Sequence, residues 1–283
     1  MTDTPRQIET PSGKGAADEN FPVGSFLLPK RLRPHVATYY AFARAIDDIA
    51  DNPDTPPQDK IARLNAMDDA LLGRTANPGP DVAKATAVRA SMLETGVNLA
   101  HASDLISAFR QDAIKSRYNT WDELIDYCMR SASPVGRYLL ELHGEDKAHF
   151  EYSDALCNAL QVINHLQDCA DDLKTMDRCY LPLDWCAQAG AKVEMLRETV
   201  SPAPLRAVQL RCLDGTEELL RVADKLPGAL KSRSLAMESG VIVAIAWKLV
   251  EKLRREDPVA VRVELSKPMF AWCGLKGAIK ALF

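Results

Sequence analysis

Two aspartates lie on one face of a segment with strong helical periodicity near the start of the chain. In PHVATYYAFARAIDDIAD, residues 34–51, Tyr40, Arg44, Asp47 and Asp51 follow one another at intervals of four, three and four positions. On an α-helix these four side chains fall within roughly 60° of one another. Apolar residues occupy the other faces, so we expect the acidic stripe to border a buried surface.

A second acidic stripe follows in the sequence ALQVINHLQDCADDLK, residues 159–174. Gln161, Asn164, Asp168 and Asp172 share one helical face, and apolar residues fill the remainder. Two further aspartates, Asp48 and Asp171, flank the stripes and are interpreted as outward-facing charges or as additional ligands. His165 shows no spacing typical of a metal ligand and is interpreted as structural.

Paired carboxylates at a buried surface repel each other and need either protons or cations. Oxygen ligands without a set of histidines or cysteines favour a hard ion, and Mg²⁺ commonly completes its shell with phosphate oxygens. Arg44 could then bind phosphate. The pattern indicates ionisation of a diphosphate ester, with Phe21, Tyr40 and Tyr127 as candidate π faces beside the carbocation.

The periodicity of the chain predicts an all-α protein without strands. We expect a disordered tail over residues 1–18 and a single domain over residues 19–283. The expected helices span residues 34–51, 61–72, 82–98, 102–114, 121–144, 152–173, 189–198, 204–226 and 235–251. The segment after Asp172 has no periodicity of its own and is predicted to be a long loop.

Composition restricts the class of protein further. The 283 residues carry a net charge of −4, which gives no electrostatic reason to expect nucleic acid as a partner. The polar N-terminus lacks the apolar core of a signal peptide, and the longest apolar run, Val241 to Trp247, is too short to span a bilayer. Seven cysteines without a Cys-x-x-Cys pair favour reduced thiols and a cytoplasmic location.

The two aspartate-rich segments resemble the signatures of the squalene/phytoene synthase family. This resemblance implies a single-domain isoprenoid-synthase helical fold in which both motifs face a central cavity and hold Mg²⁺ bound to diphosphate. The segment from Tyr127 to Gly136 resembles the family's helix beside the substrate chains, and Arg178-Cys-Tyr180-Leu-Pro182 resembles the segment after the second motif. The implied metal ligands are Asp47, Asp51, Asn164, Asp168 and Asp172. The implied catalytic residues are these four aspartates with Tyr127 and Tyr180, and the implied substrate-binding residues are Phe21, Tyr40, Arg44, Ala132, Gly136, Gln161, Asn164 and Arg178.

Three further segments are most similar to a bacterial branch of the family that serves hopanoid synthesis: residues 20–29, residues 31–44 and the sequence SASPVG at 131–136. That similarity implies presqualene diphosphate as substrate and water capture of the rearranged cation to give hydroxysqualene. It also implies functional coupling to a presqualene diphosphate synthase and to a squalene-forming reductase. One alternative is a complete synthase that joins two farnesyl or geranylgeranyl diphosphates into squalene, dehydrosqualene or phytoene. Another is a non-catalytic relative that acts as an assembly subunit.

The C-terminal sequence KPMFAWCGLKGAIKALF, residues 267–283, combines three lysines with large apolar residues. Such a segment is typical of peripheral membrane contact. Simple docking of the segment on the domain is the alternative, and the sequence leaves both open.

Overall fold

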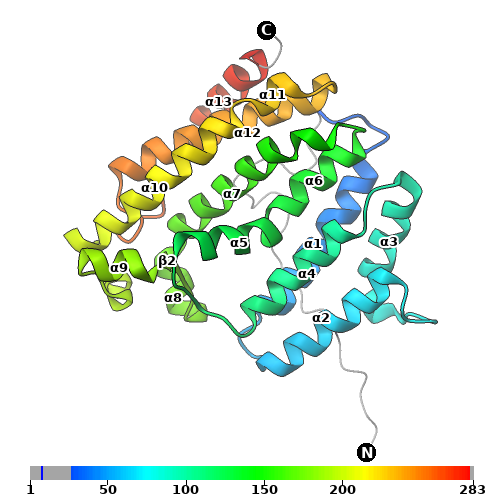
Figure 1. The fold of residues 1–283 in the computed structure, drawn as a ribbon, viewed down its shortest axis with the longest axis horizontal. Helices are drawn as coiled ribbons and strands as arrows, with labels where there is room; N and C mark the ends of the chain where they lie inside the picture. Colours follow the sequence, from blue (N-terminus) through cyan, green and yellow to red (C-terminus); the bar gives the residue numbers. More distant parts are fainter. Residues whose placement is uncertain (1–7, 9–26, 281–283) are drawn as a thin grey trace, which may run out of the picture. The chain divides into compact units, whose positions relative to one another are not determined.

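The fold is all-α, as the periodicity predicts (Figure 1). A computed structural model describes residue 8 and residues 27–280. The predicted tail, apart from residue 8, and the candidate site residue Phe21 lie outside these described residues. Contacts divide the chain into two compact units, Met1–Lys115 and Ser116–Phe283. The single domain over residues 19–283 stays a prediction.

The first unit is a group of helices around α1, which carries the first acidic stripe. Pro34 lies in the first turn of α1, and Asn52, in an extended conformation, ends the helix. Buried side chains such as Phe42 and Ile46 pack α1 against its neighbours α2, α3 and α4. The elements are α1 (Arg33–Asp51), α2 (Pro57–Leu72), η2 (Pro80–Val82), α3 (Ala83–Thr95) and α4 (Ala100–Asp112).

The second unit is organised around α7, which packs against α6, α10 and α12. Its first elements are β1 (Arg117–Tyr118), α5 (Trp121–Ser131), α6 (Ser133–Leu142), η3 (Lys147–His149), α7 (Phe150–Gln167) and α8 (Cys169–Met176). They are followed by β2 (Cys179–Pro182), α9 (Leu183–Ala189), η4 (Val193–Arg197), α10 (Ala203–Ala223), α11 (Leu226–Ala229), α12 (Arg233–Arg255) and α13 (Lys267–Lys280).

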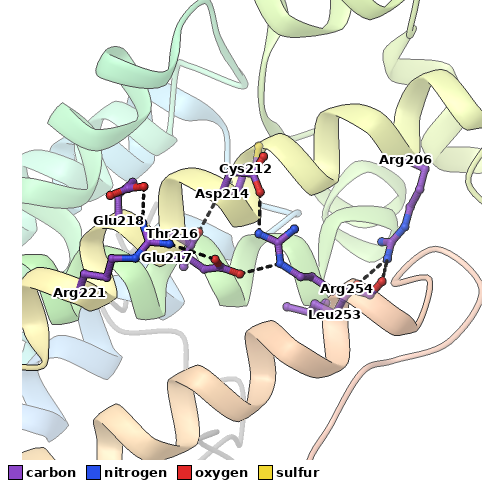
Figure 2. A network of polar contacts seen from close by, with 9 residues as sticks. All are labelled: Arg206, Cys212, Asp214, Thr216, Glu217, Glu218, Arg221, Leu253 and Arg254. Atoms are coloured by element: carbon purple, nitrogen blue, oxygen red, sulfur yellow. Dashed lines mark hydrogen bonds and ion pairs between the residues drawn. The ribbon is translucent and has the colours of Figure 1, made fainter.

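A network of charged side chains joins α10 to α12 (Figure 2). The guanidinium of Arg254 on α12 contacts Glu217 and Asp214 on α10, each at 2.6 Å. In return, Arg206 on α10 donates hydrogen bonds to the backbone carbonyls of Leu253 and Arg254 at 2.6 and 3.0 Å. A cation is favourable at these carbonyls because they belong to the last turn of α12. The network therefore ties the C-terminal end of α12 to α10.

Two predicted helices are each interrupted. The helix expected over residues 121–144 is wrong at Ala132, whose φ and ψ of −126° and −48° separate α5 from α6. Pro134 lies two residues later, in the first turn of α6, where its missing N–H and its ring prevent a continuous helix. The helix expected over residues 152–173 is wrong at Asp168, with φ and ψ of −102° and 5°, which separates α7 from α8.

The segment after Asp172 is also more ordered than predicted. It contains β2, which pairs in parallel with β1, although strands were not expected. Cys179 donates its backbone N–H to the carbonyl of Ser116 at 2.9 Å. Both strands are too short for periodicity to reveal them. The helix predicted over residues 189–198 is likewise wrong, because α9 ends at Ala189 and the 3₁₀ turn η4 covers only Val193–Arg197.

The C-terminal helix α13 lies along α12 (Figure 1). In the described part of the chain, no helix has the length and apolar character needed to cross a membrane. The cytoplasmic location stays a prediction. Six of the seven cysteines are buried and Cys157 is half-buried, in agreement with their interpretation as core residues.

Candidate active site

The first acidic stripe lies on α1 as predicted, and its four members are all half-buried. These four residues share one face of α1. Most of the residues between them, such as Phe42, Ile46 and Ile49, are buried. This burial pattern is expected of a polar stripe that borders the core without facing open solvent. Within the first unit, the structure therefore brings the predicted residues of α1 together.

Arg44 is held between two aspartates of its own helix. Its Nη2 lies 2.8 Å from Oδ2 of Asp47, and its Nε and Nη2 donate to Oδ1 of Asp48 at 2.8 and 2.6 Å. The side chain of Asp48 is only 6% exposed, so its interpretation as an outward-facing charge is wrong. Asp48 instead fixes the guanidinium of Arg44, because the intervals of three and four residues place all three side chains in reach. Burial by itself would lower the pKa of Arg44, but Asp47 and Asp48 raise it overall.

Asp47 lies in surroundings that disfavour its charged form. Burial first, and then the neighbouring carboxylate of Asp51, raise the pKa of Asp47 to about 8, although Arg44 acts in the opposite direction. Its side chain is 28% exposed, so an ion arriving from outside can still reach it. The raised pKa favours the protonated form of this carboxyl group, and a bound divalent cation would favour the carboxylate instead.

The second acidic stripe extends over the junction between α7 and α8. Its four members are half-buried, like those of the stripe on α1: Gln161, Asn164, Asp168 and Asp172. Asp171 is exposed, in agreement with its interpretation as an outward-facing charge. The helical hydrogen bonds continue on both sides of the interruption: Asp168 N–H donates to the carbonyl of Asn164 at 2.9 Å, and Asp172 N–H donates to that of Asp168 at 2.8 Å. The interruption thus leaves these polar residues on neighbouring turns.

A segment far along the chain contacts the second stripe. Arg262, which lies between α12 and α13, places Nη1 3.0 Å from Oδ1 of Asp168. Next to it, the side-chain amide of Gln167 donates to the backbone carbonyl of Val263 at 2.6 Å. Arg262 was not among the predicted site residues, because no local pattern connects residues almost a hundred positions apart. We call residues 257–266 the strap segment.

Four rings form an aromatic group beside the second stripe: Tyr118, Tyr127, His165 and Tyr180. The ring of His165 stacks on Tyr180 with centroids 3.5 Å apart, and Tyr127 lies 5.8 Å from Tyr180 and 5.3 Å from Tyr118. Burial, and then the positive charge of Arg178, lower the pKa of His165 to about 3. The imidazole is therefore neutral at physiological pH. The structure thus brings Tyr127 and Tyr180 together, and it adds His165, which the sequence analysis interpreted as structural.

Two small residues predicted to bind substrate lie where helices approach closely. A methyl group at Gly136 would meet Oγ of Ser153 at 2.2 Å and Sγ of Cys157 at 2.7 Å, both on α7. Ala132 is buried at the junction of α5 and α6. Packing of α6 on α7 is thus sufficient reason for glycine at position 136, and the substrate contacts of Gly136 and Ala132 stay predictions.

The acidic residues of both stripes suit a hard divalent cation. In the described ranges, 8 and 27–280, no three or more His, Cys, Asp or Glu side chains are grouped so as to hold a metal. The raised pKa of Asp47 nevertheless indicates a carboxylate pair that a divalent cation would relieve. The oxygen-only donors of both stripes are the ligands that Mg²⁺ prefers. That the two stripes face each other stays a prediction.

An all-α fold with two aspartate stripes and an aromatic group is the architecture expected of an enzyme that ionises prenyl diphosphates. The chain belongs to the squalene/phytoene synthase family, whose sequence model matches residues 15–269.

Hydroxysqualene synthases are among its relatives. The protein of that name from Rhodopseudomonas palustris is 42% identical, over 92% of this chain and 88% of its own. The one from Zymomonas mobilis is 41% identical, over 90% and 86%. The crystal structure of squalene synthase HpnC from Alicyclobacillus acidocaldarius has a TM-score of 0.72 at 30% identity, covering 82% of this chain and 87% of that one.

Proposed function

We propose that the protein converts presqualene diphosphate and water into hydroxysqualene and diphosphate. The observation that carries the proposal is the identity of 41–42% to two hydroxysqualene synthases over nine-tenths of the chain. The acidic stripes and the aromatic group supply side chains that suit this reaction. The enzyme is then a carbon–oxygen lyase acting on a diphosphate, and it needs no reductant.

The proposed cofactor is Mg²⁺, held by oxygen atoms of both stripes. Its ligands would be Asp47, Asp51, Asn164, Asp168 and Asp172. Bound Mg²⁺ would neutralise charge on the departing diphosphate. Two observations on this chain support the proposal. The pKa of Asp47 is raised, and the side chains of all five proposed ligands are only half-buried.

The side chains of the protein would bind, orient and protect the reacting groups. Arg44, fixed by Asp48, and buried Arg178 are cations suited to the diphosphate oxygens. When the carbon–oxygen bond breaks, its electron pair leaves with the diphosphate. The cyclopropylcarbinyl cation then rearranges, the oxygen of water bonds to the cationic carbon, and one proton of that water passes to diphosphate or solvent.

The carbocation would lie near aromatic rings. Tyr127 and Tyr180 belong to the aromatic group, and their π faces can stabilise positive charge in a site poor in water. Neutral His165 adds a ring without adding a repelling charge. Tyr40 and Phe21 are proposed to line the same region, and Gln161, Ala132 and Gly136 are proposed to contact the substrate.

Product analysis tests the proposal directly. The purified protein is incubated with presqualene, farnesyl or geranylgeranyl diphosphate, with and without NADPH and with Mg²⁺ or EDTA. We expect hydroxysqualene from presqualene diphosphate alone, with Mg²⁺ required and NADPH without effect. Squalene, dehydrosqualene or phytoene formed from the shorter diphosphates would instead identify a complete synthase, and no turnover of any substrate would favour a non-catalytic relative.

A matched pair of variants tests the role of the second stripe. Asp168→Asn should lower turnover by several orders of magnitude, because it removes a proposed metal ligand. Asp171→Asn changes the same side chain at an exposed position three residues away and should leave turnover within about threefold. Equal losses in both variants would contradict the assignment of Asp168.

The chemistry also requires two neighbouring activities. An enzyme that condenses two farnesyl diphosphates into presqualene diphosphate must supply the substrate. A reductase that replaces the hydroxyl group with hydride must consume the product if squalene is the end point. Functional coupling to both is part of the proposal.

A further inference from the structure

The C-terminal helix α13 is apolar on two opposite faces. Its inner face packs on α12 through small residues, and a methyl group at Gly277 would lie 2.2 Å from the backbone oxygen of Gly240. Cys273 on the same face is buried. Such close backbone approach fixes the rotation of α13 about its own axis. The opposite face is therefore presented to solvent in a defined orientation.

That outer face carries an apolar stripe made of Pro268, Ala271, Trp272 and Leu275. The intervals of three, one and three residues place the four side chains within about 100° on the helix. All four are exposed, with Trp272 at 66% and Leu275 at 57%. An apolar helical face of this kind is unfavourable in water unless something covers it.

The charge of the segment indicates what covers it. Residues 267–283 contain lysines at positions 267, 276 and 280 and no acidic residue, whereas the whole chain carries a net charge of −4. Lys267, which is exposed, lies by its position in the sequence about 90° from the centre of the apolar stripe. Basic residues beside an apolar face, with a tryptophan on it, are typical of helices that lie in the interface of an anionic bilayer.

A second copy of the chain fits the apolar stripe less well. Stable protein interfaces bury about 800 Å² on each partner, more than four side chains that include alanine and proline can supply. A symmetric contact would also bring the lysines of both copies together. A lipid surface has neither difficulty, since it accepts a narrow apolar stripe and attracts the lysines.

We propose that α13 lies in the surface of an anionic membrane, with Trp272 and Leu275 inserted among the lipids while Gly277 and Cys273 stay packed on α12. The surface does not depend on the reaction proposed above. At 14 residues α13 does not cross the bilayer, so the contact is peripheral and reversible. The contacts of Arg254 and Arg206 join the C-terminal end of α12, the helix on which α13 packs, to α10 (Figure 2).

Vesicle co-sedimentation with the full-length protein tests this proposal. We expect binding to vesicles of phosphatidylcholine with phosphatidylglycerol, and binding several-fold weaker to phosphatidylcholine alone or in high salt. The double variant W272S/L275S should lower the partition coefficient roughly 100-fold, because each large side chain contributes about a factor of ten when buried. The control variant L93S/V200S alters side chains that are 58% and 57% exposed elsewhere and should bind like the wild type.

Two further measurements test whether the variants fold and whether lipid, and not a second copy of the chain, covers the apolar stripe. Trp272→Phe keeps the apolar face but removes one fluorophore, so the blue shift on adding vesicles should be present in the wild type and largely lost in this variant. Equal thermal unfolding of all variants establishes their folding. The proposal is overturned if wild-type protein ignores anionic vesicles, if W272S/L275S binds as well as the control variant, or if the wild type forms a dimer that W272S/L275S disrupts without vesicle binding.

Discussion

Replacing Asp47 with asparagine should stabilise the metal-free protein while abolishing its activity. Burial and the nearby carboxylate of Asp51 raise the pKa of Asp47 from 3.8 to about 8. The folded protein therefore keeps a proton on Asp47 that the unfolded chain releases near pH 4. Asparagine has a similar shape and never ionises, so it removes the electrostatic penalty. A residue that binds a metal is expected to lower the stability of the protein when the metal is absent.

The sign and size of the effect follow from proton linkage. Between about pH 4 and pH 8 the folded protein binds more protons at Asp47 than the unfolded chain, so the free energy of unfolding falls as pH rises. Each pKa unit corresponds to about 1.4 kcal/mol, and four units would set a ceiling of roughly 5–6 kcal/mol. Because the side chain of Asp47 is 28% exposed and contacts Arg44, solvent and ion pairing should reduce the effect. We therefore expect Asp47→Asn to gain about 1–3 kcal/mol at pH 8 and little below pH 5.

Thermal unfolding in EDTA, from pH 4.5 to pH 8.5, measures this effect. The variant should unfold about 2–8 °C above the wild type at pH 8, with the gap closing towards pH 4.5. Adding Mg²⁺ with diphosphate should stabilise the wild type more than the variant. Asp48→Asn is the matched control: it keeps an acceptor oxygen but removes the negative charge that strengthens two hydrogen bonds from Arg44, so it should destabilise the protein across the whole range.

The outcome that refutes this reasoning is specific. If Asp47→Asn unfolds at a lower temperature than the wild type at pH 8, or if their difference does not change with pH, Asp47 is not strained by its surroundings. The carboxylate pair would then be compensated without a metal, and the main physical support for Mg²⁺ at α1 would be lost.

Three other changes probe the second unit. Gly136→Ala should destabilise the protein by about 1–3 kcal/mol, because its methyl group would lie 2.2 Å from Oγ of Ser153, and adding Ser153→Ala should restore part of that loss in denaturant unfolding. Arg262→Gln should change the free energy of unfolding by less than about 1 kcal/mol, since its ion pair with Asp168 is partly exposed. The same variant should lower kcat/KM roughly tenfold, because Asp168 loses the cation that orients it. Equal effects on stability and activity would contradict this. Gly277→Leu should displace α13, because any side chain there meets the backbone of α12, and limited proteolysis should then cut between residues 257 and 280 faster than in the wild type.

The sequence predicts the local arrangement well because helical periodicity is a local property. The limits of α1 and the half-buried state of both acidic stripes follow from intervals of three and four residues. The same reasoning missed the interruption at Asp168, where the helical hydrogen bonds continue on both sides and no glycine or proline marks the position. At Ala132 the sequence does carry a signal, because Ser133-Pro134 follows directly and a proline disfavours the helical conformation just before it.

The contacts that the sequence could not predict join distant residues. Arg262 pairs with Asp168, and Gln167 binds the carbonyl of Val263, 96 positions away. The burial of Asp48 is not visible in the sequence because adjacent aspartates look alike there, although both contact Arg44 and only Asp48 is buried. The stacking of His165 on Tyr180 depends on how β2 lies against α7, which neither segment encodes by itself.

The strap segment connects the second stripe to α13 over a short length of chain, which bears on how the proposed product, a water-insoluble alcohol, leaves the enzyme. Arg262 contacts an aspartate of the second stripe, and α13 begins only five residues later, at Lys267. Five residues span at most about 18 Å even when fully extended. A helix resting on lipid would thus lie within a short tether of the chemistry, and an oily product leaving the enzyme would meet acyl chains before it met the bulk aqueous phase.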